Sequence, residues 1–273
     1  MARTSDPSWP TTGPGGWEAW RGPEEPPPEP VPWYARRRLW LVVAILTAVG
    51  YVVVGVLSTA RVYWEFHRKP NAWELYRAAG EEVRNRWRTW PAEKIFPDSV
   101  PYTSEQGGIE HAGRVGIAPE RGCDTGIDSV SAAVLVRYGC RALLRATYVD
   151  QMQGIVLTVG IVALPDDRSA RLAGESVAPT DPSVPGPFLH ALAFPQTIAA
   201  RFADTARQFA TADRVGPYVV LTVAGPTDGR PASAVRKPHG GWFQLAPEVG
   251  RNIAGALAQP VQPDCAQKQE WKC

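Results

Sequence analysis

The sequence predicts an α+β fold in which one N-terminal transmembrane helix and a juxtamembrane helix precede an antiparallel sheet with flanking helices. Three observations predict it: an uncharged apolar run long enough to cross a bilayer, two apolar segments separated by a three-residue turn, and helical segments that alternate with hairpin-connected strands. The hairpin connections favour an antiparallel sheet over the repeated βα units of parallel sheets.

Residues 39–60 form the long uncharged apolar run, and Arg38 and Arg61 flank it. At a helical rise of about 1.5 Å per residue, these 22 residues span about 33 Å, which exceeds a hydrocarbon core of about 30 Å. The run lacks the polar stripe of a soluble core helix, and it starts too late for a cleaved signal peptide. We therefore expect a transmembrane helix with aromatic residues in both interfaces.

Charge and cysteine placement predict the orientation of this helix. Arg36–Arg38 precede the run and one arginine follows it directly, which favours a cytoplasmic N-terminus, although the bias shrinks over a wider window. All four cysteines follow the run, and an even set on one side suits an oxidising compartment. The chain is thus predicted to be a single-pass signal anchor of the cell membrane with an extracytoplasmic C-terminal domain.

Composition divides the rest of the chain. Residues 1–38 are rich in proline and poor in aliphatic side chains, so we expect a disordered cytoplasmic tail. Its Pro26–Pro30 segment is read as a solvated stretch, with a ligand for an aromatic-lined groove as the alternative. The predicted parts after the transmembrane helix are a juxtamembrane amphipathic helix and linker at 61–97, an extracytoplasmic α+β domain at 98–259 and a C-terminal tail at 260–273.

A helix is predicted directly after the membrane, because Asn71 is a good N-cap and apolar residues recur every three or four positions until Pro91. Its seam packs onto the domain, forms a dimeric coiled coil or lies on the bilayer. The first reading is favoured because the seam covers fewer than three heptads. The seam residues are Trp73, Tyr76, Gly80, Val83, Trp87 and Trp90.

The segment 91–122 is rich in proline and glycine, which predicts an extended, turn-rich stretch with one short strand at 113–118. An amphipathic helix follows. Asp124 or Thr125 is its expected cap, and Gly139 is expected to end it in the left-handed conformation. The residues predicted to share its apolar face are Ile127, Val130, Val134 and Leu135.

Two strands are predicted at 140–150 and 154–164, on either side of Gln151–Gln153, a length that suits a hairpin turn. Asp166 and Asp167 are expected to cap the next helix. The later predicted elements are that helix from Pro165 through Gly174, a loop at 175–187, a strand at 188–195, a helix at 198–212, a strand at 217–224, a turn at 227–230 and a terminal helix at 245–257.

Four cysteines allow three pairings, and disulfides are favoured over a metal site because no close C-x-x-C pair is present. We expect Cys123–Cys140 and Cys265–Cys273, while a crossed pairing such as Cys123–Cys265 remains open. The first pair must bridge a helix of about 18 Å with Cα atoms within about 7 Å. Both flanks of that helix must therefore fold back under it.

The sequence contains no nucleophile elbow, zinc-protease helix, phosphate-binding loop or dinucleotide fingerprint. We therefore expect no catalytic residue, no cofactor and no metal. A Ser/His/Asp site through His111 or His239 is the minor alternative to surface histidines, and His67 and His190 are equally scattered. Asp228–Arg230 is read as a tight turn, with a presented recognition loop as its minor alternative.

Seven short motifs lie within residues 61–258: Pro91–Pro97, Arg114–Ala118, Gly139–Cys140, Arg145–Asp150, Thr158–Gly160, Pro217–Tyr218 and Asp228–Arg230. In these motifs the chain resembles an uncharacterised family of actinobacterial single-pass membrane proteins with an extracytoplasmic α+β domain. The resemblance implies that architecture and no assigned activity. The layout is also loosely similar to the extracytoplasmic sensor domains of mycobacterial receptor kinases, but the sequence carries no kinase domain.

The net charge of +2 gives no electrostatic case for nucleic acid. The predicted function is a membrane-anchored extracytoplasmic binding or interaction domain without catalytic activity, as a sensor-like or accessory protein of the cell envelope. Its predicted partners are the lipid bilayer and an envelope protein, and its oligomeric state is left open. The alternatives are an envelope hydrolase with a site that spacing does not reveal, and a scaffold whose Pro-rich tail recruits cytoplasmic proteins.

Overall fold

The computed structural model describes residues 33–183, 186, 188–234 and 240–261. The chain forms two compact units, Met1–Phe66 and His67–Cys273. The predicted N-terminal tail lies mostly outside the described residues, as do Cys265, Cys273 and His239.

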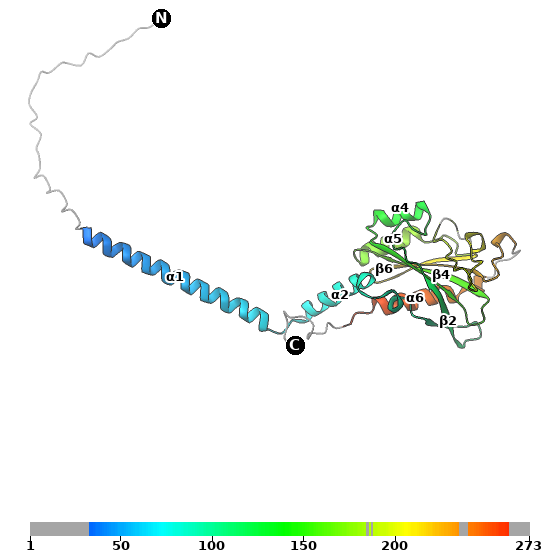
Figure 1. Ribbon diagram of the computed structural model, residues 1–273, viewed down its shortest axis with the longest axis horizontal. Helices are drawn as coiled ribbons and strands as arrows, with labels where there is room; N and C mark the ends of the chain where they lie inside the picture. The colour runs from blue at the N-terminus through cyan, green and yellow to red at the C-terminus, as the bar shows by residue number, and fades with distance from the viewer. Residues whose placement is uncertain (1–32, 184–185, 187, 235–239, 262–273) are drawn as a thin grey trace, which may run out of the picture. The chain divides into compact units, whose positions relative to one another are not determined.

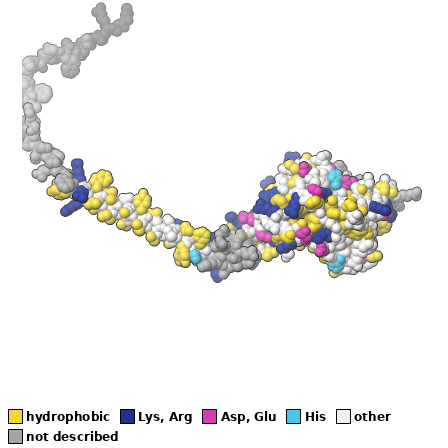
Figure 2. All heavy atoms as spheres, viewed as in Figure 1, with side chains coloured by type: hydrophobic (Ala, Val, Ile, Leu, Met, Phe, Trp, Pro, Cys, Tyr) yellow, Lys and Arg dark blue, Asp and Glu magenta, His cyan; other side chains and the backbone are white. Residues whose placement is uncertain are grey.

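The described part of the first unit is one long helix, α1 (Trp33–His67). Within Arg36–His67, an 18-residue window has a mean hydropathy of 2.5, and none of this window is buried. Figure 2 shows hydrophobic side chains along its exposed surface, with basic side chains at its start. A helix that is apolar all round and uncovered is stable in lipid, so α1 is a candidate membrane span. The helix begins at Trp33, which corrects the prediction that the tail extends to residue 38.

Helix α2 (Ala72–Thr89) begins at the predicted cap. The Asn71 side chain accepts from the Glu74 amide and the Glu74 carboxylate accepts from the Asn71 amide, which forms a capping box. The predicted seam is wrong in its first half, because Trp73 and Tyr76 are exposed. The buried residues of α2 all lie from Ala78 onward, where the helix packs against α6. The second half of α2 thus belongs to the domain and is no separate linker element.

The domain contains one six-stranded antiparallel sheet in the order β1-β2-β3-β4-β6-β5 (Figure 1), which confirms the predicted fold class. The central strands pair in register along their whole length, from Ala142↔Ala163 to Val149↔Val156 between β3 and β4. The strands are β1 (Ser99–Thr103), β2 (Ile109–Ile117), β3 (Ala142–Val149), β4 (Ile155–Ala163), β5 (Phe209–Val215) and β6 (Tyr218–Pro226).

Helices cover both faces of this sheet (Figure 1). On one face lie the second half of α2, the short α3 (Ala92–Ile95) and α6 (Leu245–Ala258). On the other lie α4 (Ser129–Arg137), α5 (Asp167–Val177) and the segment around Leu189. Strands β3, β4 and β6 are buried on both sides, which explains their continuous apolar sequences. Three single 3-10 turns complete the domain: η1 (Asp204–Ala206), η2 (Ala232–Ala234) and η3 (Gly240–Phe243).

The predicted hairpin of β3 and β4, the strand β6 and the helices α5 and α6 are confirmed. Helix α5 is capped by Asp166, whose carboxylate accepts from the Ser169 amide; this hydrogen bond lowers the pKa of Asp166. Helix α4 begins only after its cap Asp128, so the predicted start at Asp124 or Thr125 is wrong. Of its predicted apolar face, Ile127 precedes the helix and Val130 is exposed.

Three other predictions are wrong. The predicted helix at 198–212 contains only η1 before β5 starts at Phe209, because pairing with β6 overrides local helix propensity. The predicted strand at 188–195 reduces to a single bridge between Ile127 and Leu189. Strand β1 was missed, since Pro101 suggested a turn; proline is tolerated there because β1 is an edge strand.

The disulfide Cys123–Cys140 is present, with Cα atoms 6.1 Å apart. The predicted folding back of both flanks is visible in two hydrogen bonds. The Cys140 amide donates to the Leu135 carbonyl at 3.0 Å, after Gly139 has turned the chain with φ of +83°. The Leu143 amide donates to the Arg121 carbonyl at 3.1 Å, which brings the other flank onto β3. This pairing rules out the crossed alternative through Cys123.

Candidate functional site

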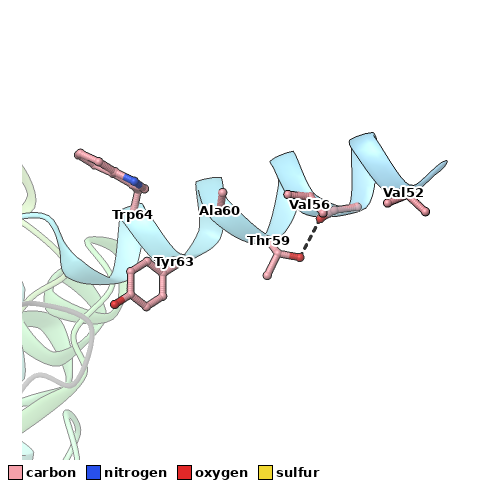
Figure 3. A pocket seen from close by; sticks show the side chains of 7 residues that line it. Val52, Val56, Thr59, Ala60, Tyr63 and Trp64 are labelled. Atoms are coloured by element: carbon pink, nitrogen blue, oxygen red, sulfur yellow. Dashed lines mark hydrogen bonds between the residues drawn. The ribbon is translucent and has the colours of Figure 1, made fainter. Parts of the chain in front are cut away.

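A groove of about 620 Å³ runs along α1, but it is no site of the folded domain. Figure 3 shows that its labelled lining residues, among them Val56, Tyr63 and Trp64, all come from one helix. The Thr59 hydroxyl in this groove donates to the Gly55 carbonyl at 2.8 Å, which satisfies it within the helix. The groove is surface that a bilayer would cover.

Two adjoining hollows lie at one end of the sheet in the domain. The larger, which we call the acidic hollow, has a volume of about 470 Å³, and the smaller, the donor hollow, about 170 Å³. Both are lined by Ile155 and Trp242, so these two residues separate them. The acidic hollow is also lined by Tyr102, Glu105, Glu110, Asp150 and Met152, and the donor hollow by Gln208, Pro226, Arg230 and Phe243.

Antiparallel topology explains why these residues meet. The β1–β2 turn and the β3–β4 turn both lie at the same end of an up-and-down sheet. The end of β6 also lies there, because Ile155 pairs with Pro226. The 3-10 turn η3 then places Trp242 beside Ile155 just before α6 begins. The site is therefore built from segments that are remote in sequence and rest on a buried frame.

Asp150 shapes the β3–β4 turn. One carboxylate oxygen accepts from the Ile155 amide at 2.6 Å, and the other accepts from the Met152 amide at 3.2 Å. Gln153 adopts a φ of +57° in the same turn. This arrangement holds Met152 at the tip, where 78% of its surface is exposed.

Glu110 lies in the acidic hollow beside a buried phenol. The Tyr102 hydroxyl donates to its carboxylate at 2.6 Å and accepts from the Gln151 amide at 3.3 Å. Burial and then the hydrogen bond to Glu110 raise the pKa of Tyr102 far above its usual range. Tyr102 therefore stays a protonated donor, which fixes the Glu110 side chain at the wall of the hollow.

The acidic hollow carries negative charge without a compensating cation. Its carboxylates are Glu105, Glu110 and Asp150, and none of its described lining residues is a lysine, arginine or histidine. No ion pair joins any of the three to another residue in the described part of the chain. A concave surface of one charge sign concentrates its field toward a ligand of the opposite sign.

The donor hollow has the opposite polarity. Gln208 is 6% exposed, and its buried Nε2 atom has no hydrogen-bond partner among the described residues. Arg230 lines the same hollow and is held by Asp228, whose Oδ2 accepts from the Arg230 Nε at 2.7 Å. That side-chain hydrogen bond lowers the pKa of Asp228. Arg230 thus offers accessible N–H groups at the donor hollow, and the Gln208 amide lies buried in its wall.

The turn at 227–230 is confirmed. Gly229 has a φ of +74°, and a Cβ there would lie 2.6 Å from the Arg201 carbonyl oxygen, so only glycine fits. This turn is what brings Arg230 to the donor hollow.

The wall between the two hollows is aromatic. Trp242 is 59% exposed although it lies at the centre of the two-part site. Its neighbour Phe243 is buried and stacks on Phe209 with ring centroids 6.2 Å apart, which anchors η3 to the sheet. Sequence reasoning did not find Trp242, Glu105 or Met152, because no spacing in the chain relates them.

Among the described residues, His111 does not form the predicted alternative Ser/His/Asp site, and His239 lies outside the described residues. His111 is exposed on β2 and His67 ends α1. A histidine–carboxylate pair joins His190 Nδ1 to Asp204 Oδ2 at 2.6 Å, and no hydroxyl of the described residues is hydrogen-bonded to His190. No group of three His, Cys, Asp or Glu residues in the described ranges is placed to hold a metal ion.

Comparison of the chain with known protein families, curated proteins and solved structures finds no match in any of the three. The chemistry of the site is therefore the basis for a function.

Proposed function

We propose that this protein is a membrane-anchored, non-catalytic binding protein of the cell envelope that recognises its partner at the acidic hollow. One observation carries the proposal: an exposed tryptophan and an exposed methionine lie at a concave surface with three carboxylates that form no ion pair with any described residue. Exposed aromatic side chains combined with uncompensated charge are typical of recognition surfaces. The residues that line the acidic hollow supply both charge and apolar surface, a combination that suits binding of a partner.

The location of the domain is part of the proposal. The candidate membrane helix α1 and the disulfide Cys123–Cys140 favour a domain in an oxidising compartment outside the cytoplasm. The arginines at the start of α1 favour a cytoplasmic N-terminus.

The topology is testable with Met152→Cys and Ser5→Cys, each made in a full chain in which Cys265 and Cys273 are replaced by serine, while Cys123 and Cys140 stay in their disulfide. In intact cells a membrane-impermeant maleimide should label position 152 and leave position 5 unlabelled until lysis. The reverse pattern would invert the topology and remove the envelope location.

Site-specific photo-crosslinking tests the binding function. A photoreactive benzoylphenylalanine replaces Met152 in the full chain, expressed in intact cells. Its matched control replaces Val136, which is exposed on α4 on the opposite face of the sheet. We expect a discrete crosslinked product from position 152 alone. No product at position 152, or the same products from both positions, would contradict the proposal.

The alternative of an envelope hydrolase is favoured by one observation, the pair of His190 and Asp204, which is half exposed. A carboxylate that holds one ring nitrogen of a histidine is part of many hydrolytic sites. Labelling of the full chain by a fluorophosphonate probe, abolished in His190→Ala, would support this alternative. Absence of labelling would remove it.

A further inference from the structure

We propose that the ligand of this site is a peptide segment with a basic side chain, which enters the acidic hollow against Trp242 while a backbone or terminal carboxylate oxygen of the same segment reaches the donor hollow. This inference rests on the proposed function, because it names the chemistry of the partner at the same site. Three independent features of the two hollows carry it.

The first feature is the buried charge of Asp150. This carboxylate is buried, and its hydrogen bonds come only from the amides of Met152 and Ile155. Glu105 and Glu110 add two further negative charges to the same wall. An ammonium or guanidinium group entering the hollow would meet carboxylates that have no cationic partner among the described residues, so the complex gains charge pairs that the free protein lacks.

The second feature is the apolar surface beside these carboxylates. The exposed ring of Trp242 offers a face for a cation, and the exposed thioether of Met152 offers a flexible apolar contact. Lysine and arginine combine an apolar stem with a charged end, which matches this lining. A divalent metal fits less well, because no three acidic, histidine or cysteine side chains of the described residues converge on one point.

The third feature is the donor hollow. The Nε2 atom of Gln208 is buried and has no hydrogen-bond partner among the described residues, and Arg230 lines the same hollow. Both groups donate hydrogen bonds, so they are complementary to a carbonyl or carboxylate oxygen. A ligand with a cation on one side of Trp242 and such an oxygen on the other is a peptide, whereas a simple amine satisfies the acidic hollow alone.

Calorimetric titration of the full chain in lipid nanodiscs tests the inference with defined probes. The probes are N-acetyl-Gly-Lys-Gly with a free carboxylate, the same peptide with norleucine or glutamate in the middle, and n-butylamine. We expect the lysine peptide to bind at least 10-fold more tightly than the norleucine peptide and the glutamate peptide not to bind. Butylamine should bind more weakly than the lysine peptide, and added salt should weaken the binding of both.

Variants in each hollow test separately which part of the ligand that hollow binds. The double variant Glu105→Gln/Glu110→Gln should weaken binding of the lysine peptide at least 10-fold. Gln208→Leu should weaken binding of the lysine peptide several-fold and leave the affinity for butylamine unchanged. The matched control, Glu175→Gln, changes an exposed carboxylate on α5 on the other face and should leave both affinities unchanged. Circular dichroism spectra and melting temperatures identify any variant that fails to fold.

The outcomes separate the two proposals. If the norleucine peptide binds as tightly as the lysine peptide, or if the double variant binds the lysine peptide normally, the proposal of a cationic ligand is wrong. If Gln208→Leu weakens peptide and amine equally, the assignment of the donor hollow is wrong. If no probe binds while position 152 still crosslinks, the ligand class fails and the binding function stands. If position 152 gives no crosslink either, both fail.

Discussion

Two arginines of the domain are both buried, and their surroundings are opposite. Arg86 on α2 is 1% exposed and Arg145 on β3 is 6% exposed. The guanidinium of Arg86 donates hydrogen bonds to several partners, whereas the buried Nε atom of Arg145 has no hydrogen-bond partner in the described part of the chain. The contribution of a buried charged side chain to stability therefore depends on its hydrogen-bond and charge partners, and not on burial alone.

Arg86 joins α2 to the end of α6. It donates to the carbonyls of Leu257 at 2.8 Å and Gln259 at 2.7 Å, where the last turn of α6 leaves acceptors free. Its Nε atom donates to Glu82, and its guanidinium carbon lies 4.5 Å from the centre of the Trp90 ring. The Tyr218 hydroxyl adds a hydrogen bond to the Val83 carbonyl of the same helix.

Arg145 has room because Gly126, which has no side chain, lies beside its guanidinium group. It pairs across the sheet with Gly160, and a Cβ on Gly126 would lie 2.0 Å from its guanidinium carbon. Its nearest carboxylate oxygen belongs to the exposed Glu120, 3.9 Å from its Nη2. Burial lowers the pKa of Arg145, which shows that its surroundings disfavour the charge.

The largest effect is expected for Arg86→Met. The substitution leaves the carbonyls of Leu257 and Gln259 without their charged donor, so we expect a loss of about 3 kcal/mol in the free energy of unfolding. Urea unfolding of the full chain in nanodiscs, followed by near-UV circular dichroism, measures it. Arg88→Met, an exposed change on the same helix, should cost less than about 0.5 kcal/mol. Equal losses in both variants would contradict the role given to Arg86.

Gly126→Ala should have the next largest effect, a loss of about 2 kcal/mol. Gly126 has a φ of +75°, and the added methyl group would collide with Arg145. The double variant Gly126→Ala/Arg145→Met should recover part of the loss, because it removes the collision and leaves only the backbone strain. Gly154→Ala is the control, since a Cβ there meets nothing within 4 Å. Full additivity in the double-mutant cycle would show that the two residues do not interact.

Arg145→Met should change the unfolding free energy by less than about 1 kcal/mol in either direction. Replacing a poorly paired buried charge by an apolar side chain of similar size is often neutral or stabilising. Chemical denaturation under the same conditions as for Arg86→Met gives a direct comparison. A loss above about 2 kcal/mol would mean that Arg145 stabilises the domain as Arg86 does.

The smallest effect is expected for Glu120→Gln, below about 0.5 kcal/mol, because an exposed carboxylate at 3.9 Å is a weak partner. The melting temperature at low and at high salt checks this. A clear loss at low salt that disappears at high salt would show that Glu120 compensates Arg145 after all.

The elements that sequence reasoning predicted are those with local causes. Strands β3, β4 and β6 are buried on both faces, so they are recognisable in the sequence as continuous apolar runs. The helix caps Asn71 and Asp166 are recognisable from residue type and position alone. The edge strands β1 and β5 were missed because their structure depends on the neighbouring strand. The same holds for the seam of α2, whose buried face is decided by α6.

The candidate site was predictable only in fragments. The turn at Asp228–Arg230 was recognised as a turn with a minor reading as a recognition loop, and Arg230 does line a hollow. The disulfide Cys123–Cys140 was predicted, but it lies on the α4 side and not at the site. The proximity of Glu105, Met152 and Trp242 follows from strand order and register, which are properties of the whole sheet.

The acidic hollow is made by the tips of turns, while the strands beneath it are buried on both faces. Turn tips accept substitutions more readily than a packed interior does. Exchanges of Glu105, Met152 and Trp242 should therefore have little effect on folding. If the acidic hollow is the proposed binding site, its specificity can diverge faster than the strands that support it.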